Sequence, residues 1–343
     1  MEKKQTNPIK SLLTIIISLA FAGFFLWLAL RDFDIKVVQK SLLRANYLWV
    51  ILAGAFGILA YWLRAVRWNL LLEPMGYKIS NSNAFWTISF GYLMNLTIPR
   101  SGEVARATAL YGVEKVPVDK SFGTIILERV VDLFCMLGFL LLTVIFKYDA
   151  ILSFYKNSGV NINTSKVLLI ISILVIGALL FFSFKNRLAA IPVLNKIINF
   201  IDGIIQGLMS IFKLKQKVKF ILYTIGIWAC YFMATYLVCF ALPETSDFTI
   251  ADGFFIIVVG TLGMIIPASG GIGAFNLAMK YGFMALFLSM GKSAEFGSET
   301  GLTYSFISLP LQIVIMLITG LLSIPILAKV RNQAVADKEF KSI

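Results

Sequence analysis

Hydrophobic residues run along this chain in stretches that are long enough to cross a lipid bilayer. About 20 apolar residues span a hydrocarbon core about 30 Å thick when they form a helix. The stretches that predict such helices are 11–30, 47–66, 121–146, 167–184, 218–242 and 303–328. Only helices and closed barrels satisfy their backbone polar groups in lipid, so the pattern predicts an all-α polytopic membrane protein.

The composition agrees with this pattern and sets the class of partner. Of 343 residues, 59% are hydrophobic and 14% are charged, and the mean hydropathy is +0.84, which is too apolar for a soluble domain. The formal charge of +13 comes from Lys and Arg in the short connections, which predicts membrane orientation rather than binding of nucleic acid. We therefore expect residues 1–343 to form a single integral membrane domain whose partners are lipids.

Residue types also weigh against an enzyme. The chain contains no histidine, which removes the usual general base near neutral pH and the commonest metal ligand. Cys135, Cys230 and Cys239 fall within predicted helices, where a thiol acts as a small apolar filler and predicts no disulfide. We expect no cofactor, no metal site and no catalytic residue.

Charges in the connections predict the orientation. Both termini carry lysines and are expected in the cytoplasm, as is the basic connection 185–219. Within that connection, residues 188–212 alternate at helical spacing and predict an amphipathic helix on the inner leaflet. The acidic connections 243–250 and 291–302 are expected outside, and the membrane is expected to be the bacterial cytoplasmic (inner) membrane.

Two shorter apolar stretches do not fit a simple sequence of spans. The stretch 84–98 lies between two basic regions, and the stretch 251–290 lies between two acidic ones, so each is predicted to form a re-entrant hairpin. Their breaks match as Ile-Pro-x-Ser-Gly, at 98–102 and 266–270. The match predicts an inverted repeat, with a first repeat of roughly 1–146 and a second of roughly 167–330, as in many transporters. A chance match between apolar segments is the alternative.

The breaks have a chemistry of their own. Proline ends one helix, and Ser and Gly open the next one, which leaves free N–H groups pointing into the protein. Such helix starts bind anions, and in a membrane the natural anion is a lipid phosphate. Kinks that are relieved by neighbouring helices are the structural alternative.

Ionisable residues gather near the first break and on the adjacent helices. Each costs at least about 2.5–3.5 kcal/mol at the bilayer centre, so an unpaired charge there needs a reason. Glu128 and Asp132 lie four residues apart on one helix face and need cations opposite them, for which Arg129, Arg100 and Arg106 are candidates. A structural network of ion pairs and a polar cavity for a head group both fit this pattern. Arg64 and Arg67 fit inner-leaflet anchors equally well.

Four short motifs carry a resemblance to a known family. They are Arg-Ala-Val-Arg-Trp at 64–68, Pro-Arg-Ser-Gly-Glu-Val-Ala-Arg at 99–106, Glu-Arg-Val-Val-Asp at 128–132 and Pro-Ala-Ser-Gly-Gly-Ile-Gly at 267–273. Over most of its length the chain resembles the transmembrane region of lysylphosphatidylglycerol synthases, also described as flippase-like. The resemblance implies lipid translocation, as in multiple peptide resistance factors, which pass aminoacylated phosphatidylglycerol between leaflets.

The motifs and the charges together give a set of candidate substrate-binding residues. They are Arg64, Arg67, Pro99, Arg100, Ser101, Gly102, Glu103, Arg106, Glu128, Arg129, Asp132, Pro267, Ser269, Gly270, Gly271, Gly273 and Asn276.

Two departures from the family pattern limit what the resemblance implies. A short basic tail follows the last predicted helix, so we expect neither the soluble aminoacyl transferase domain nor lipid aminoacylation. Asn276 stands where the family pattern suggests an acidic residue, which argues against a cationic head group.

The leading hypothesis is a lipid flippase or translocase that moves a phospholipid, or another anionic or modified lipid head group, between leaflets. One alternative is a membrane glycosyl or phosphoryl transferase on a polyprenyl-linked substrate, with Asp32 and Asp34 as its paired carboxylates. Another is a non-transporting partner of a separate lipid-modifying enzyme. A homo-oligomer is compatible with all three.

Overall fold

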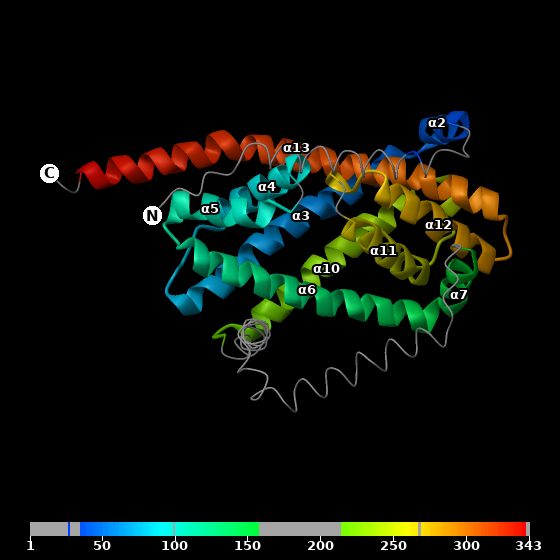
Figure 1. Cartoon of the computed structure of the whole chain (residues 1–343), viewed down its shortest axis with the longest axis horizontal. Coiled ribbons are helices and arrows are strands. Elements are labelled where there is room, and N and C mark those ends of the chain that lie inside the picture. Colours follow the sequence, from blue (N-terminus) through cyan, green and yellow to red (C-terminus); the bar gives the residue numbers. More distant parts are fainter. Residues whose placement is uncertain (1–26, 28–34, 99, 158–213, 267–268, 341–343) are drawn as a thin grey trace, which may run out of the picture.

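The structure is a computed structural model that describes residues 27, 35–98, 100–157, 214–266 and 269–340 (Figure 1). All regular secondary structure in these residues is helical. The helices are α2 (Ile35–Arg44), α3 (Tyr47–Leu72), α4 (Asn81–Thr97), α5 (Gly102–Glu114), α6 (Val118–Phe146), α7 (Tyr148–Asn157), α10 (Lys217–Cys239), α11 (Ile250–Ile265), α12 (Ala274–Ser289) and α13 (Ala294–Phe340). Three short 3₁₀ turns, η1 (Glu73–Met75), η2 (Pro243–Thr245) and η3 (Ser269–Gly271), join them.

Several expected features lie outside the described residues. They are the helices at 11–30 and 167–184, the amphipathic helix at 188–212, the pair Asp32 and Asp34, and the two prolines Pro99 and Pro267.

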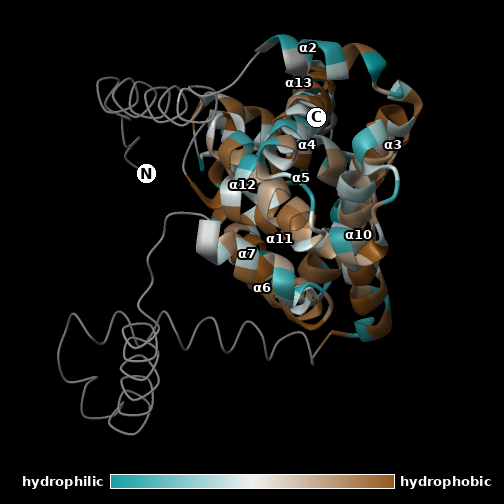
Figure 2. Ribbon diagram, turned by 90° about the vertical axis from the view of Figure 1, so that its right-hand side faces the viewer, coloured by the Kyte–Doolittle hydropathy of each residue, from teal (hydrophilic) through white to brown (hydrophobic). Residues whose placement is uncertain are grey.

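Four helices of the described part are long and apolar enough to cross a membrane. The spans are Tyr47–Met75, Val118–Phe146, Lys217–Cys239 and Ala294–Gln333. α6 turns an apolar face outward, with Leu133, Phe134 and Leu141 each more than half exposed. Figure 2 shows that hydrophobic residues dominate most of the ribbon. An outward apolar surface of this kind is stable in lipid and not in water, so the prediction of an all-α, multi-pass membrane protein is confirmed.

α13 is longer than any bilayer requires. Its 47 residues include Pro310 and Pro325, and at 1.5 Å per residue they extend about 70 Å, more than twice the hydrocarbon core. It runs along one side of the molecule while α6 runs along the opposite side, with α3, α10 and α11 between them (Figure 1). The predicted helix 303–328 is therefore the central part of a longer one.

Both interrupted stretches are broken by the same backbone event. α4 ends where Ile98 adopts an extended conformation (φ −129°, ψ 110°), and α11 ends where Ile266 does the same (φ −66°, ψ 129°). Each isoleucine precedes a proline in the sequence, and the proline ring disfavours a helical conformation in the residue before it. The stretch 251–290 is thus two helices, α11 and α12. After the first break the chain forms α5, a helix that the hydrophobic pattern alone did not define.

α4 and α5 form an antiparallel hairpin that is fastened at both ends. Far from the break, the Glu114 carboxylate accepts hydrogen bonds from the Ser80 backbone N–H (2.9 Å) and the Asn83 amide (2.7 Å). Near the break, Asn95 Oδ1 accepts one from the Gly102 N–H (2.7 Å). Between these points Gly91 packs against Gly102 and Arg106, so the two backbones lie in direct contact.

Replacing Gly102 by alanine is expected to destabilise this hairpin. A Cβ at position 102 would lie 2.3 Å from the Gly91 carbonyl oxygen and 2.5 Å from the Asn95 amide nitrogen, which forces the backbones apart and costs about 1–3 kcal/mol. Gly112→Ala on the same helix is the control, since nothing lies within 4 Å of its Cβ position. Melting in detergent should show a clear loss for Gly102→Ala and none for Gly112→Ala. Equal melting temperatures would contradict the close packing.

α11 and α12 form a second antiparallel hairpin. Gly263 packs against Ala274 and Phe275 near the break, and Gly282 packs against Val259 further along. At its far end, Asp252 and Thr249 form a capping box at the start of α11, and the Asp252 carboxylate pairs with the Lys147 ammonium at 2.5 Å. This ion pair ties the end of α6 to the start of the second hairpin.

The two breaks lie next to each other in space. The Arg100 guanidinium donates a hydrogen bond to the carbonyl oxygen of Ile265, the last residue of α11 (3.3 Å). A Cβ on Gly270 would lie 3.1 Å from a methyl group of Leu96 near the end of α4. Residues about 170 positions apart in the sequence are thus brought together.

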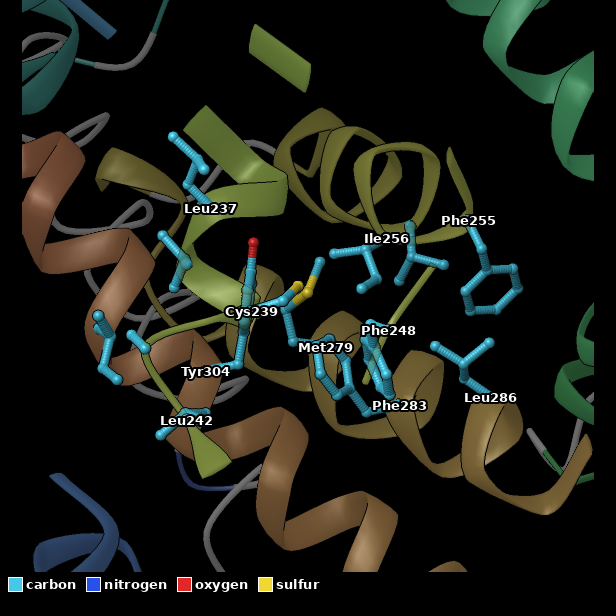
Figure 3. Close-up of a cluster of buried hydrophobic side chains, with 14 of the residues drawn as sticks. Leu237, Cys239, Leu242, Phe248, Phe255, Ile256, Met279, Phe283, Leu286 and Tyr304 are labelled. Atoms are coloured by element: carbon cyan, nitrogen blue, oxygen red, sulfur yellow. The ribbon is translucent and has the colours of Figure 1, made fainter. Parts of the chain in front are cut away.

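Buried side chains form two main packing centres. The larger joins α10, α11, α12 and α13, and Figure 3 shows Leu237, Phe248, Met279 and Tyr304 within it. The smaller joins α3, α4, α5 and α6 around Trp68. The charged residues that the sequence singled out lie beside this smaller centre.

Candidate functional site

Seven ionisable side chains from three helices form one connected set in the first half of the chain. We call it the arginine–carboxylate cluster; α3 contributes Arg64 and Arg67, α5 contributes Glu103 and Arg106, and α6 contributes Glu128, Arg129 and Asp132. Each of the three acids lies within 4.0 Å of at least one arginine nitrogen of the cluster.

Glu128 is the most deeply buried acid of the cluster, at 1% exposure. Its two carboxylate oxygens accept hydrogen bonds from the two terminal nitrogens of Arg106, at 2.8 and 3.1 Å. The Arg64 Nε lies 3.6 Å from it. A two-point arginine–carboxylate contact is among the stronger pairs in proteins, and it fixes α5 against α6.

The Arg106 guanidinium also stacks on an aromatic ring. It lies 3.6 Å from the centre of the Trp68 ring, in a cation–π contact that strengthens when water is excluded. The Trp68 indole N–H in turn donates to Thr124 Oγ1 at 2.8 Å. The guanidinium plane of Arg106 is therefore positioned by the Trp68 ring of α3 and by the Glu128 carboxylate of α6.

Asp132 links the two arginines of α3. One oxygen accepts a hydrogen bond from Arg64, and the other accepts one from Arg67 at 3.1 Å. Arg67 is fully buried and also donates to Thr224 Oγ1 of α10 at 3.2 Å. Arg64 and Arg67 are thus interior side chains, and the alternative that they are inner-leaflet anchors is wrong.

Two tyrosines complete the surroundings of Arg64. Its Nη1 lies 3.1 Å from the hydroxyl oxygen of Tyr92 on α4 and 3.0 Å from that of Tyr231 on α10. Through Tyr231 and Thr224 the cluster reaches the second half of the chain. Arg64 thus contacts both α10 and the first hairpin.

The outer edge of the cluster is the pair formed by Arg129 and Glu103. Arg129 Nη2 lies 3.1 Å from Glu103 Oε1, and the two side chains are 46% and 28% exposed. Both line a small pocket with Arg106, whose remaining walls are Ile88, Gly91, Tyr92, Asn95 and Gly102. The volume open to water there is about 10 Å³, roughly that of one water molecule. This volume is too small for a head group as the side chains are arranged here.

The charges of the cluster do not cancel. Four arginines face three carboxylates, which leaves one positive charge. In addition, the Nε–H groups of Arg64, Arg67 and Arg106 are buried and make no hydrogen bond within the described residues. A site with this balance attracts anions.

The first break places three of the candidate residues outside this network. Arg100 is exposed, has a positive φ of 62° and donates to Ile265, so it does not approach Glu128 as one interpretation had it. The single O–H of Ser101 lies within hydrogen-bond distance of the carbonyl oxygens of Ile98 (2.7 Å) and Met94 (3.0 Å) and so caps the end of α4. The Gly102 N–H is bonded to Asn95. The prediction of a free N–H at this residue is therefore wrong, because the Asn95 side chain of α4 accepts its hydrogen bond.

At the second break, the charged contact that the structure describes is the Arg100 guanidinium on the Ile265 carbonyl oxygen. Ser269, Gly270 and Gly271 form the turn η3, in which Gly270 and Gly271 have positive φ. Asn276 Oδ1 accepts a hydrogen bond from the Gly273 N–H (3.0 Å), and its amide donates to Ser305 of α13 (2.7 Å). These contacts engage Asn276 within the second half of the chain.

Several residues around the cluster were not among the candidates. Tyr92, Tyr231, Thr224 and Asn95 all contact it or shape its pocket. Thr224 and Tyr231 stand seven residues apart, two helical turns on one face of α10, which is a readable signal of a polar stripe. Nothing in the sequence pairs that stripe with the arginines of α3.

Comparison with known proteins gives a consistent result. The model of the family described as lysylphosphatidylglycerol synthase TM region matches residues 15–320. The chain is also similar to the UPF0104 membrane protein MJ1595 of Methanocaldococcus jannaschii, with 30% identity over 134 residues, 38% of this chain and 39% of that protein. The matched part is thus about two fifths of the length of that curated relative. No solved structure matches the chain significantly.

Proposed function

Because the chain belongs to the family of the lysylphosphatidylglycerol synthase TM region, we propose that it moves a phospholipid, or another lipid with an anionic or modified head group, between the leaflets of a membrane. The family itself was identified correctly from the four motifs. The family is that of the membrane part of a lipid-modifying enzyme, which supports a lipid-related role.

The arginine–carboxylate cluster is the observation that carries the proposal. Three of its four arginines are nearly or completely buried between helices of an apolar protein, where burying a charge costs energy unless it is paired or used. The cluster keeps one positive charge in excess and three Nε–H groups without hydrogen-bond partners in the described part of the chain. Both features suit a lipid phosphate, which is anionic and accepts hydrogen bonds.

The mechanism that fits best is alternating access around this cluster. In the proposal, α4–α5 and α11–α12 are re-entrant hairpins of an inverted repeat, and their tips meet near a pseudo-twofold axis within the membrane. The contact of Arg100 with the end of α11 supports this arrangement. The head group would cross beside the first tip while its acyl chains stay in lipid, and the small pocket would widen when the halves move apart.

We further infer that the chain transports rather than catalyses. Glu103, Glu128 and Asp132 are each paired with arginine, and an acid held in this way is a poor general base. The family match supports a second candidate, a non-transporting partner of a separate lipid-modifying enzyme, because its description refers to the membrane region of such an enzyme.

The proposed orientation places both termini and residues 185–219 in the cytoplasm of a bacterial cell, and residues 243–250 and 291–302 outside. A cysteine at Lys215 should resist a membrane-impermeant thiol reagent in intact cells and react after the cells are opened. A cysteine at Lys292 should react in intact cells. Labelling of the Lys215 position in intact cells would overturn the orientation.

Reconstitution tests the proposed activity. The purified chain is placed in liposomes with a fluorescent phosphatidylglycerol, and a membrane-impermeant quencher reports which leaflet holds the lipid. Faster exchange between leaflets than in protein-free liposomes is expected. Exchange at the protein-free rate in every lipid tested would favour the non-transporting partner.

A further inference from the structure

The four arginines of the cluster differ in how closely they are paired with carboxylates. Arg106 is bound by Glu128 through two hydrogen bonds, and Arg64 and Arg67 share Asp132. These three are nearly or completely buried. Arg129 is about half exposed, and its nearest acid is Glu103 at 3.1 Å, with Asp132 at 4.0 Å.

Glu103 lies beside Arg129 at the small pocket. It lies in the first turn of α5, where a negative charge is favoured by the helix dipole, and it lines the small pocket together with Arg106 and Arg129. That pocket has room for about one water, which is too little for a phosphate group as the side chains are arranged here.

The charge count of the cluster indicates which kind of group would suit the position of the Glu103 carboxylate. With Glu103 in place the cluster has four arginines and three carboxylates, an excess of one positive charge. If the Glu103 side chain turned outward, the excess at the pocket would be two. A phosphodiester carries one negative charge, so it would restore the resting balance by taking the position of Glu103, charge for charge.

We propose that Glu103 is a tethered competitor: its carboxylate occupies the anion position of Arg129 in the empty protein, and the phosphodiester of a lipid head group displaces it. Glu103 thereby sets how readily the site accepts lipid. This inference rests on the proposed function for its ligand. Exposed arginine–carboxylate pairs are weak, so a phosphodiester that makes contacts of its own can displace the side chain.

The test measures the affinity of the full-length chain for a fluorescent phosphatidylglycerol in nanodiscs of digalactosyldiacylglycerol, a lipid without phosphate. Glu103→Gln keeps the size of the side chain and removes its charge, and it is expected to raise the affinity about two- to fivefold, as the loss of a weak competing pair would. Arg129→Gln should lower the affinity. In the double variant the gain from Glu103→Gln should vanish, because the competition acts through Arg129.

Glu114→Gln is the matched control. Glu114 lies at the other end of α5, where its carboxylate accepts hydrogen bonds from Ser80 and Asn83, and the amide oxygen of glutamine can still accept them. Its affinity should equal that of the parent. An equal gain in Glu114→Gln and Glu103→Gln would mean a general effect of charge and would overturn the proposal.

A competition experiment with a water-soluble phosphodiester distinguishes a lipid ligand from a free phosphate ester. Glycerophosphoglycerol carries the same phosphate ester without acyl chains, and it should displace the fluorescent lipid only weakly. Displacement as effective as by unlabelled phosphatidylglycerol would contradict a lipid as the ligand.

Leaflet exchange of the same variants separates the inference from the proposed function. Exchange by the parent with no gain in affinity in Glu103→Gln would overturn the competitor and leave transport standing. A gain in affinity through Arg129 without exchange in any variant would support the competitor and contradict transport.

Discussion

Arg106→Ala is expected to lower the stability of the folded chain by about 3–5 kcal/mol, the usual cost of removing one partner of a buried ion pair. The substitution leaves the Glu128 carboxylate at 1% exposure without its two-point partner, and the ion pair that remains in the described structure is with the Arg64 Nε at 3.6 Å. It also removes the cation that stacks on Trp68. The measurement is thermal unfolding of the purified protein in detergent, followed by tryptophan fluorescence.

The double variant Arg106→Met/Glu128→Leu separates structure from transport. Both charges are gone and the space stays filled, so most of the stability should return, as it does when other buried pairs are replaced by apolar residues. Under the proposal this stable variant moves no lipid, because Arg106 lines the pocket. Melting of Arg106→Ala at the parental temperature would contradict the buried pair.

Asp132→Asn is expected to be similarly damaging, by about 3–5 kcal/mol, because Asp132 is shared by two buried arginines. With its charge removed, the cluster has four arginines against two carboxylates, and Arg67 loses the one acid with which its guanidinium is paired in the described structure. Lower yield, a lower melting temperature and loss of leaflet exchange should therefore appear together.

Asp119→Asn provides the comparison on the same helix. Asp119 lies in the first turn of α6 and is exposed, so the same chemical change there should alter stability by less than about 0.5 kcal/mol. If Asp132→Asn melted and exchanged lipid like Asp119→Asn, the contacts of Asp132 with Arg64 and Arg67 would carry neither stability nor transport.

The membrane helices could be predicted from the sequence because their signal is local. The apolar stretches 47–66, 121–146 and 218–242 correspond to α3, α6 and α10 with ends that differ by a few residues. The breaks at 98 and 266 were also readable, since a proline constrains the residue before it. α5 was not defined as a helix, because Glu103, Arg106 and Thr108 give its sequence no continuous apolar run.

The candidate site could be predicted in part, for an energetic reason. Charges within apolar helices must find partners, which is why Glu103, Arg106, Glu128, Arg129 and Asp132 do lie together. Arg100 does not join them, because its backbone sits in the turn and its side chain points to the end of α11. Whether the cluster binds a substrate stays a prediction.

What could not be predicted depends on contacts between distant parts of the chain. The hydrogen bond of Arg64 to Tyr231 joins residues 167 positions apart, and the ion pair of Lys147 with Asp252 joins two helices that are not neighbours in the sequence. Spacing along a single helix carries no information on such pairs. They follow only from how α3, α6, α10 and α11 pack.

Leaflet exchange by Arg129→Gln tests the central claim, that the arginine–carboxylate cluster handles the head group, most directly. Arg129 is the half-exposed arginine of the cluster, so its loss should leave the melting temperature close to that of the parent. Lys120→Gln, an exposed cation on the same helix, is the control for net charge. The account predicts that in liposomes Arg129→Gln exchanges fluorescent phosphatidylglycerol far more slowly than the parent and Lys120→Gln. Exchange at the parental rate by a folded Arg129→Gln protein would contradict it.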